Sequence, residues 1–210
     1  MFARFQTIRP TPDTDGPEAG RHELTDVLRR HAGYSGAYYL VSGPSALRAL
    51  VTLWSTEEDA RLAPERTRAA FGGGPRPVTV EEDTVYEVVD DEAGTAGDAD
   101  PDVAAVVVFD GPFSDAARTA ADRAHRRRIL PALRSLPGTV RLVVLWDRLA
   151  RSFRVLHLAR GPAALDAARD TVEATELGED EDPALLSPPD RVERWDVAAA
   201  DLPVARAVRS

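Results

Sequence analysis

The chain has 210 residues, of which 43% are hydrophobic and 29% are charged, a composition typical of a globular protein that buries a sizeable core. Its formal net charge of −9 argues against a nucleic-acid partner, because an acidic surface repels the phosphate backbone. The absence of cysteine excludes disulfide bonds, thiolate metal ligands and a cysteine nucleophile. All 26 basic residues are arginine, which together with abundant Ala, Gly and Pro suggests a GC-rich genome such as that of an actinobacterium.

The first residues of the chain, 2–8, are expected to form a strand. They lack the basic segment followed by an apolar segment that marks a signal peptide. No apolar run in the sequence approaches the length of a membrane-spanning helix. We therefore expect a cytoplasmic protein that makes no contact with a membrane.

The first half of the sequence predicts the order strand, helix, strand, strand, helix, strand. Apolar residues at helical spacing indicate the first helix, and Gly33 is suited to its C-terminal end. Ser55 and Glu58 match a capping box that begins the second helix. The expected elements are strand 2–8, a helix ending before 33, a hairpin of strands 34–41 and 47–54, a helix from 55 to 71 and a strand within 78–89.

The second half repeats this order after an acidic segment, 91–102, which is predicted to be a solvated linker because it is small, charged and without periodicity. Pro131 predicts a kink in the long first helix of this half. The expected elements are strand 103–109, a helix from 114 to 136, a hairpin of strands 140–146 and 153–159, a helix from 162 and a strand 191–198. The predicted domains are 1–90 and 103–198, followed by a tail over 199–210.

Two short matches between the halves indicate an internal repeat. Leu28-Arg29-x-x-x-Gly33 matches Leu133-Arg134-x-x-x-Gly138 at a separation of 105 residues, and Tyr86-Glu87-Val88 matches Trp195-Asp196-Val197 at 109. The four-residue difference falls in the loop before the last strand, where insertions are tolerated. Each half is therefore predicted to be a β-α-β-β-α-β unit with the ferredoxin-like fold.

A sheet that carries helices on one face needs a second surface to bury its other face. The predicted fold is accordingly α+β, with two ferredoxin-like repeats packed sheet to sheet as an intramolecular α+β barrel. Such a chain would be a monomeric pseudo-dimer or would pair again as a homodimer.

The first half resembles the antibiotic-biosynthesis-monooxygenase family of dimeric α+β barrel proteins. The matching segments are His31-Ala32-Gly33-Tyr34-Ser35-Gly36, Leu53-Trp54-Ser55-Thr56-Glu57-Glu58-Asp59-Ala60 and Val85-Tyr86-Glu87-Val88. The resemblance covers residues 1–90, and over 103–198 it rests on the repeat. Members of this family include cofactor-independent oxygenases of aromatic polyketides, haem-degrading oxygenases and many proteins of unknown role, so the resemblance implies the fold more specifically than the activity.

Trp54 occupies the family's recurrent tryptophan position, and the resemblance implies that it lines the pocket. Strand alternation places Thr52 on the same face. The alternative is that Trp54 only packs the core, because large aromatic side chains bury area wherever they lie. Gln6 lies near the position where haem-degrading relatives carry an asparagine, and it shares a face with Arg4. This polar pair suggests a polar cavity or, alternatively, a solvated barrel mouth.

His157 is the candidate base of the second half, and it matches Thr52 at the separation of 105 residues. A histidine that faces a closed apolar cavity is suited to accept a proton from a phenolic or anthrone-like substrate. The alternative is a hydrogen-bonded core histidine. Because Trp54 corresponds to Ala159, the two halves cannot carry identical sites.

The helix after Trp54 contains no histidine over residues 61–70, where haem-degrading relatives supply the haem ligand. We therefore expect no haem, no other cofactor and no metal. The predicted function is a cofactor-independent monooxygenase acting on a small aromatic, polyketide-like substrate. The alternative is a non-catalytic small-molecule-binding or interaction protein with the same fold.

Overall fold

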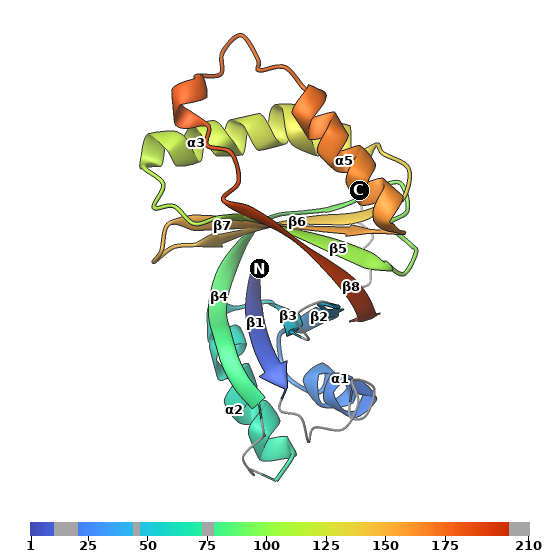
Figure 1. Cartoon of the computed structure of the whole chain (residues 1–210). Coiled ribbons are helices and arrows are strands. Elements are labelled where there is room, and N and C mark those ends of the chain that lie inside the picture. Colours follow the sequence, from blue (N-terminus) through green and yellow to red (C-terminus); the bar gives the residue numbers. More distant parts are fainter. Residues whose placement is uncertain (11–20, 44–46, 73–77, 202–210) are drawn as a thin grey trace, which may run out of the picture. The chain divides into compact units, whose positions relative to one another are not determined.

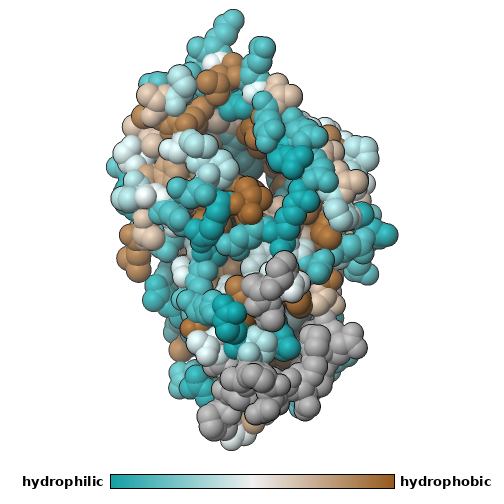
Figure 2. All heavy atoms as spheres, viewed as in Figure 1, coloured by the Kyte–Doolittle hydropathy of each residue, from teal (hydrophilic) through white to brown (hydrophobic). Residues whose placement is uncertain are grey.

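The computed structural model describes residues 1–10, 21–43, 47–72 and 78–201, which form two compact units (Figure 1). The first unit comprises Met1–Tyr86 together with the chain from Ala198 onward, and the second comprises Glu87–Val197. No helix within the described ranges is long and apolar enough to cross a membrane. On the face visible in Figure 2, the surface is mainly hydrophilic with scattered apolar residues.

The first unit follows the predicted element order. Its elements are β1 (Phe2–Pro10), α1 (Arg21–Arg29), β2 (Tyr34–Val41), β3 (Arg48–Trp54), α2 (Glu57–Ala70) and the first part of β4 (Val78–Ala93). The strand order is β4-β1-β3-β2, as a ferredoxin-like unit requires, and the end of β8 (Arg191–Asp201) lies beside β2. The cap of α2 is Thr56 rather than the predicted Ser55, because the Thr56 hydroxyl accepts the hydrogen bond from the Asp59 backbone N–H.

The second unit has the corresponding order β8-β5-β7-β6, with the second part of β4 beside β6. Its elements are β5 (Val103–Phe109), α3 (Asp115–Ala124), the π-helix η1 (His125–Ile129), α4 (Leu130–Arg134), β6 (Thr139–Asp147), β7 (Ser152–Ala159), α5 (Pro162–Ala174), the 3-10 helix η2 (Pro183–Leu185) and β8. The α+β class is thus confirmed, with antiparallel pairing in the ladders β1–β3, β2–β3, β4–β6, β5–β7, β5–β8 and β6–β7.

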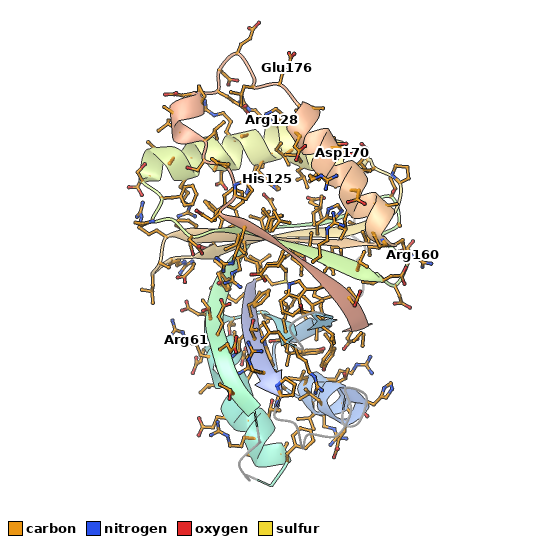
Figure 3. All side chains as sticks on the ribbon, viewed as in Figure 1. Arg61, His125, Arg128, Arg160, Asp170 and Glu176 are labelled. Carbon is orange, nitrogen blue, oxygen red and sulfur yellow. The ribbon has the colours of Figure 1, made fainter. Side chains whose placement is uncertain are left out.

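The irregularity predicted at Pro131 appears one turn earlier, as the π-helix η1. Proline has no backbone N–H and crowds the preceding turn, so the helix widens just before it. The backbone N–H of Leu130 donates to the carbonyl of His125, five residues back. The side chain of His125 is mostly buried, with its Nε2 atom 3.8 Å from Asp90 Oδ2 (Figure 3).

The predicted linker 91–102 requires a correction at its start, because residues 91–93 lie in β4. Asp91 is paired with Arg141 through two contacts of 2.5 and 2.8 Å, which offset the cost of placing acidic residues in a sheet. The next residues form a turn in which the N–H of Gly94 donates to Val140 O at 2.9 Å. The last strand also extends beyond its predicted end, to Asp201, and residues 202–210 of the predicted tail lie outside the described ranges.

The two units match in register as well as in strand order. The β2–β3 ladder shifts register after Tyr34, which pairs with Trp54. The β6–β7 ladder shifts at the same place, after Thr139, which pairs with Ala159. The glycine before each shift has a positive φ, 78° at Gly33 and 83° at Gly138, a conformation that side chains disfavour. Corresponding residues can therefore be compared directly.

In each unit the helices cover one face of the sheet (Figure 1). In the first unit, Trp54 on β3 packs with Leu28 of α1 and Ala63 of α2. In the second unit, Phe153 on β7 packs on the α3 side and Ala159 packs with Leu165 of α5. The alternate positions of the strands, on the opposite face, are buried and mostly apolar, with Thr7 and Arg154 as buried polar members. The apolar members include Ala3, Phe5, Val51, Leu53, Ala104, Val106, Val143, Leu145, Leu156 and Leu158.

Candidate functional site

Four of the predicted site residues share the helix-facing side of the first unit. Arg4 pairs with Thr52 in the β1–β3 ladder, and alternation along the two strands places Gln6 and Trp54 on the same face. The contacts agree, because Trp54 packs on both helices and Arg4 donates to a backbone carbonyl of α2. The structure thus brings Arg4, Gln6, Thr52 and Trp54 into one layer between the sheet and its helices.

Trp54 lies at the centre of this layer and is fully buried. Its indole Nε1 donates a hydrogen bond of 2.8 Å to Thr52 Oγ1. The ring of Tyr34 stands edge-on to the indole, with 5.6 Å between the centroids, and the ring of His31 lies at 6.4 Å. The turn that links α1 to β2 therefore encloses the indole from one side.

Arg4 and Gln6 are tied to neighbouring elements and do not face an open polar cavity. The Arg4 guanidinium pairs with Asp83 of β4 and donates to Ala60 O at 3.0 Å. Gln6 Nε2 donates to the same Asp83 carboxylate at 3.3 Å. These partners hold the two side chains at the interface of β1, β4 and α2, while the buried Nε atom of Arg4 has no hydrogen-bond partner within the described residues.

His31 is the functional candidate that the sequence analysis did not single out. Its Nε2 atom is buried and makes no hydrogen bond within the described residues. Burial lowers the pKa of His31, and the nearby Arg66 guanidinium lowers it further, so the imidazole is neutral at physiological pH. A neutral imidazole with an unoccupied nitrogen beside Trp54 is suited to accept a proton. The sequence feature that could have identified His31 is its place in the segment His31-Ala32-Gly33-Tyr34, whose histidine and tyrosine both lie beside Trp54.

Tyr34 belongs to a second polar network in the first unit. Its hydroxyl donates to Asp201 Oδ2 at 2.8 Å. Arg29 donates to the same carboxylate at 3.0 and 2.9 Å. Burial and the bond to Asp201 raise the pKa of Tyr34, while the Arg29 guanidinium lowers the pKa of Asp201, so the phenol is neutral and the carboxylate ionised. Asp201 falls in the segment predicted to be a tail.

His157 is buried on the helix-facing side of β7. Its strand neighbours at alternate positions, Val155 and Ala159, belong to the clusters beneath α3 and α5. His157 Nε2 is 3.2 Å from Thr139 Oγ1, and that hydroxyl donates to Leu133 O at 3.0 Å. Because the Thr139 proton is used by the carbonyl, the His157 Nε2–H must be the donor in this pair. Burial lowers the pKa of His157 to about 4, which makes it a neutral, hydrogen-bonded histidine.

The second unit lacks the polar constellation of the first. Register places Ala105 opposite His157 where the first unit has Arg4 opposite Thr52. By the same register Val107 corresponds to Gln6, and Ala159 to Trp54. Small and apolar side chains thus occupy three of these four positions.

A surface pocket of about 380 Å³ lies in the second unit, between α3 and the loop that precedes η2. None of the predicted site residues lines it. Its acidic residues already have partners, since Asp180 pairs with Arg127 at 3.0 Å and Glu181 with Arg128 at 3.0 Å. Across the described ranges, no group of three or more His, Asp or Glu side chains is arranged to hold a metal ion.

Comparison with known proteins gives structural matches only. No protein-family profile matches the sequence, and no curated protein matches it. A protein from Fusobacterium nucleatum named as a monooxygenase is 10% identical, with a TM-score of 0.59 and coverage of 96% of this chain and 94% of that one. An anthrone oxidase-like protein is 17% identical, with a TM-score of 0.51 and coverage of 95% and 92%.

A third structure is an uncharacterised ferredoxin-fold protein from Listeria monocytogenes, related to antibiotic biosynthesis monooxygenases. It is 11% identical to this chain, with a TM-score of 0.50 and coverage of 95% of each chain. Similarity at such low identity concerns the fold alone. The chain therefore shares the α+β, ferredoxin-like fold of these structures, the fold that the resemblance of its first half implied.

Proposed function

We propose that this protein is a cofactor-independent monooxygenase that acts on a small aromatic, polyketide-like substrate in the first unit. The observation that carries the proposal is the buried, unpartnered Nε2 atom of a neutral His31 beside the indole of Trp54. The names of two structural neighbours, a monooxygenase and an anthrone oxidase-like protein, support the same reaction class.

In the proposed reaction His31 Nε2 removes a proton from an activated CH₂ group of the substrate. The resulting carbanion transfers an electron to O₂, and the two radicals combine to form a C–O bond and a peroxide anion. The peroxide takes up the proton from His31, then loses water to leave a carbonyl. The CH₂ group is thereby oxidised to C=O while O₂ is reduced to the carbonyl oxygen and one water molecule, so no cofactor is needed.

The protein's part in this reaction is a proton acceptor in a dry, aromatic environment. Trp54 supplies an apolar wall, and Thr52 fixes its indole by accepting the Nε1–H bond. Arg4 and Gln6 act indirectly, because both bind Asp83 of β4 and Arg4 also donates to Ala60 O of α2, which holds these elements beside the site. His157 stays a predicted base, but its low pKa and its bond to Thr139 make it a weaker proton acceptor than His31.

We also infer that the two units arose by tandem duplication and pack sheet to sheet as a barrel. Their matching ion pairs support the duplication, since Arg29–Asp201 in one unit corresponds to Arg134–Glu92 in the other. The apolar strand face that each unit turns away from its helices supports the packing. Small-angle scattering of the monomer should give a radius of gyration of about 17 Å. Two separated lobes would contradict the barrel.

A non-catalytic small-molecule-binding role is the second candidate. The divergence of the two units favours this role, because the second unit has Ala105, Val107 and Ala159 at the positions of Arg4, Gln6 and Trp54. Binding without oxygen uptake distinguishes this role from catalysis.

The experiment is an oxygen-uptake and melting-temperature assay over a panel of anthrones and hydroxynaphthalenes. We expect uptake by the wild type, weaker binding in Trp54→Phe and unchanged kinetics in Trp146→Phe, which alters a buried tryptophan of the other unit. A raised melting temperature without uptake would support the binding protein. If the panel changes neither quantity, both proposals fail for this substrate class.

A further inference from the structure

The carboxylate of Asp201 collects three hydrogen bonds in the first unit. Tyr34 donates one of 2.8 Å, and Arg29 donates two of 3.0 and 2.9 Å. Only 17% of the Asp201 side chain is exposed, compared with 58% of Arg29. The Tyr34 hydroxyl is therefore hydrogen-bonded to a residue near the far end of the described chain, 167 residues away in sequence.

Tyr34 covers Trp54. The tyrosine is partly buried and packs against the cluster that contains the fully buried indole. The two rings meet edge to face at 72°, with 5.6 Å between their centroids. A planar ligand that is to stack on the indole and reach His31 Nε2 has to displace either this ring or the helix side chains that surround the indole. The tyrosine is only partly buried, whereas Leu28, Ala60 and Ala63 of the helices are buried.

We infer that Asp201 is a positioning residue that latches Tyr34 over the Trp54 site and thereby controls access to it. The latch itself is inferred from the Tyr34–Asp201 geometry, whereas its role in admitting a substrate rests on the proposed function. Loss of the carboxylate frees the phenol, so the indole becomes accessible. Arg29 holds the carboxylate toward Tyr34 by a two-point contact, which fixes the direction of the latch.

The second unit provides a matched control for this inference. Arg134 and Glu92 occupy the positions of Arg29 and Asp201, with 3.7 Å between their charged atoms. Thr139 replaces Tyr34 there, and Ala159 replaces Trp54. The ion pair of the second unit therefore holds no ring over an indole, and its removal should have no effect on Trp54.

The test measures acrylamide quenching of Trp54 fluorescence in a chain whose other tryptophans are replaced, Trp146→Phe and Trp195→Phe. We expect Asp201→Ala to raise the quenching constant severalfold and Asp201→Asn, which keeps an acceptor for the phenol, to raise it less. Glu92→Ala should leave it unchanged. If Asp201→Ala quenches no more than Glu92→Ala, the latch does not exist.

Should the double replacement fail to fold, 5-fluorotryptophan labelling of the otherwise unaltered chain gives the same answer. The ¹⁹F resonance of Trp54, assigned by its loss in Trp54→Phe, should shift in Asp201→Ala and stay in place in Glu92→Ala. Neither readout requires a substrate, so the latch can be confirmed even if oxygen uptake is absent. Where uptake is present, Asp201→Ala should change KM more than kcat, whereas a general loss of structure would lower kcat and the melting temperature together.

Discussion

The two units of this protein share strand order, register and even the irregular step in one ladder, yet they fill the layer between sheet and helices differently. The first unit places a tryptophan, a histidine and a tyrosine there, with ion pairs at the margins. The second unit has an aromatic cluster under α3, where Phe113, Trp146 and Phe153 pack together and Arg118 lies over the Trp146 ring at 4.4 Å.

The comparison shows that a shared backbone register places side chains at equivalent positions but does not determine which side chains occupy them. Arg4–Thr52 and Ala105–His157 are equivalent pairs, but only the first includes a charged side chain with hydrogen-bonded partners on two further elements. Burying a polar group without a hydrogen bond is costly. At these equivalent strand positions the second unit makes one histidine–threonine bond, whereas the first unit maintains two networks around Trp54 and leaves His31 Nε2 without a partner within the described residues.

The largest effect should follow loss of the central indole. Trp54→Ala removes a fully buried aromatic side chain and leaves Thr52 without its donor, which should lower the free energy of unfolding by about 3–5 kcal/mol. At the equivalent position, Ala159→Gly should lower it by only about 1 kcal/mol. Urea denaturation of both variants checks this difference, and equal losses would mean that Trp54 is not the centre of its unit.

Low pH should decrease the stability of the second unit through protonation of His157. Its folded-state pKa of about 4 lies below the ordinary value of 6.5, so the unfolded chain binds the proton more readily between these pH values. Stability is therefore present above pH 6.5 and decreases as pH falls toward 4, by about 3 kcal/mol for this group. His157→Gln should remove that part of the slope in denaturation measured across pH, and an unaltered slope would contradict the buried, neutral assignment.

Two arginines that differ in burial should contribute differently to the free energy of unfolding. Arg4 is 14% exposed, and Arg4→Met removes its ion pair with Asp83, which keeps the bond from Gln6, and its hydrogen bonds to two α2 carbonyls, at a cost of about 1–3 kcal/mol. Arg134 is 56% exposed and 3.7 Å from Glu92, so Arg134→Met should cost less than about 1 kcal/mol. Urea titration of the two variants measures both values, and the reverse order would show that the networks are misassigned.

The smallest expected effect is that of adding haem to the protein. Because α2 supplies no histidine and the chain has no cysteine, we expect no tight complex. Titration with haem, followed by the absorbance of the bound form, should show no stoichiometric step. Sub-micromolar binding would reveal a ligand elsewhere in the chain.

Sequence patterns were sufficient for the element order and the ferredoxin-like fold, because each helix and strand carries its own periodicity and turn residues. They failed where contacts distant in sequence decide the outcome. Asp91 was predicted to lie in the linker because its partner Arg141 is 50 residues away. Asp201 was predicted to lie in the tail because its partner Tyr34 is 167 residues away. Alternation correctly grouped Thr52 with Trp54, but it could not tell which face of β7 meets the helices, and so His157 was expected to face a cavity.

The candidate site was therefore only partly predictable. The family resemblance singled out Trp54 and Gln6, strand alternation added Thr52 and Arg4, and the structure places all four in one layer. His31 was visible only as part of a turn segment, since its importance depends on an unpartnered nitrogen that no sequence pattern reports.

The central claim, that chemistry belongs to the first unit, is tested most directly by a pair of histidine variants in the oxygen-uptake assay. His31→Gln and His157→Gln make the same change, one in each unit, and both side chains remain able to form hydrogen bonds. We predict that His31→Gln lowers turnover by about a hundredfold or more, as loss of a general base does, and that His157→Gln retains it. Loss of turnover in His157→Gln with retention in His31→Gln would contradict the account.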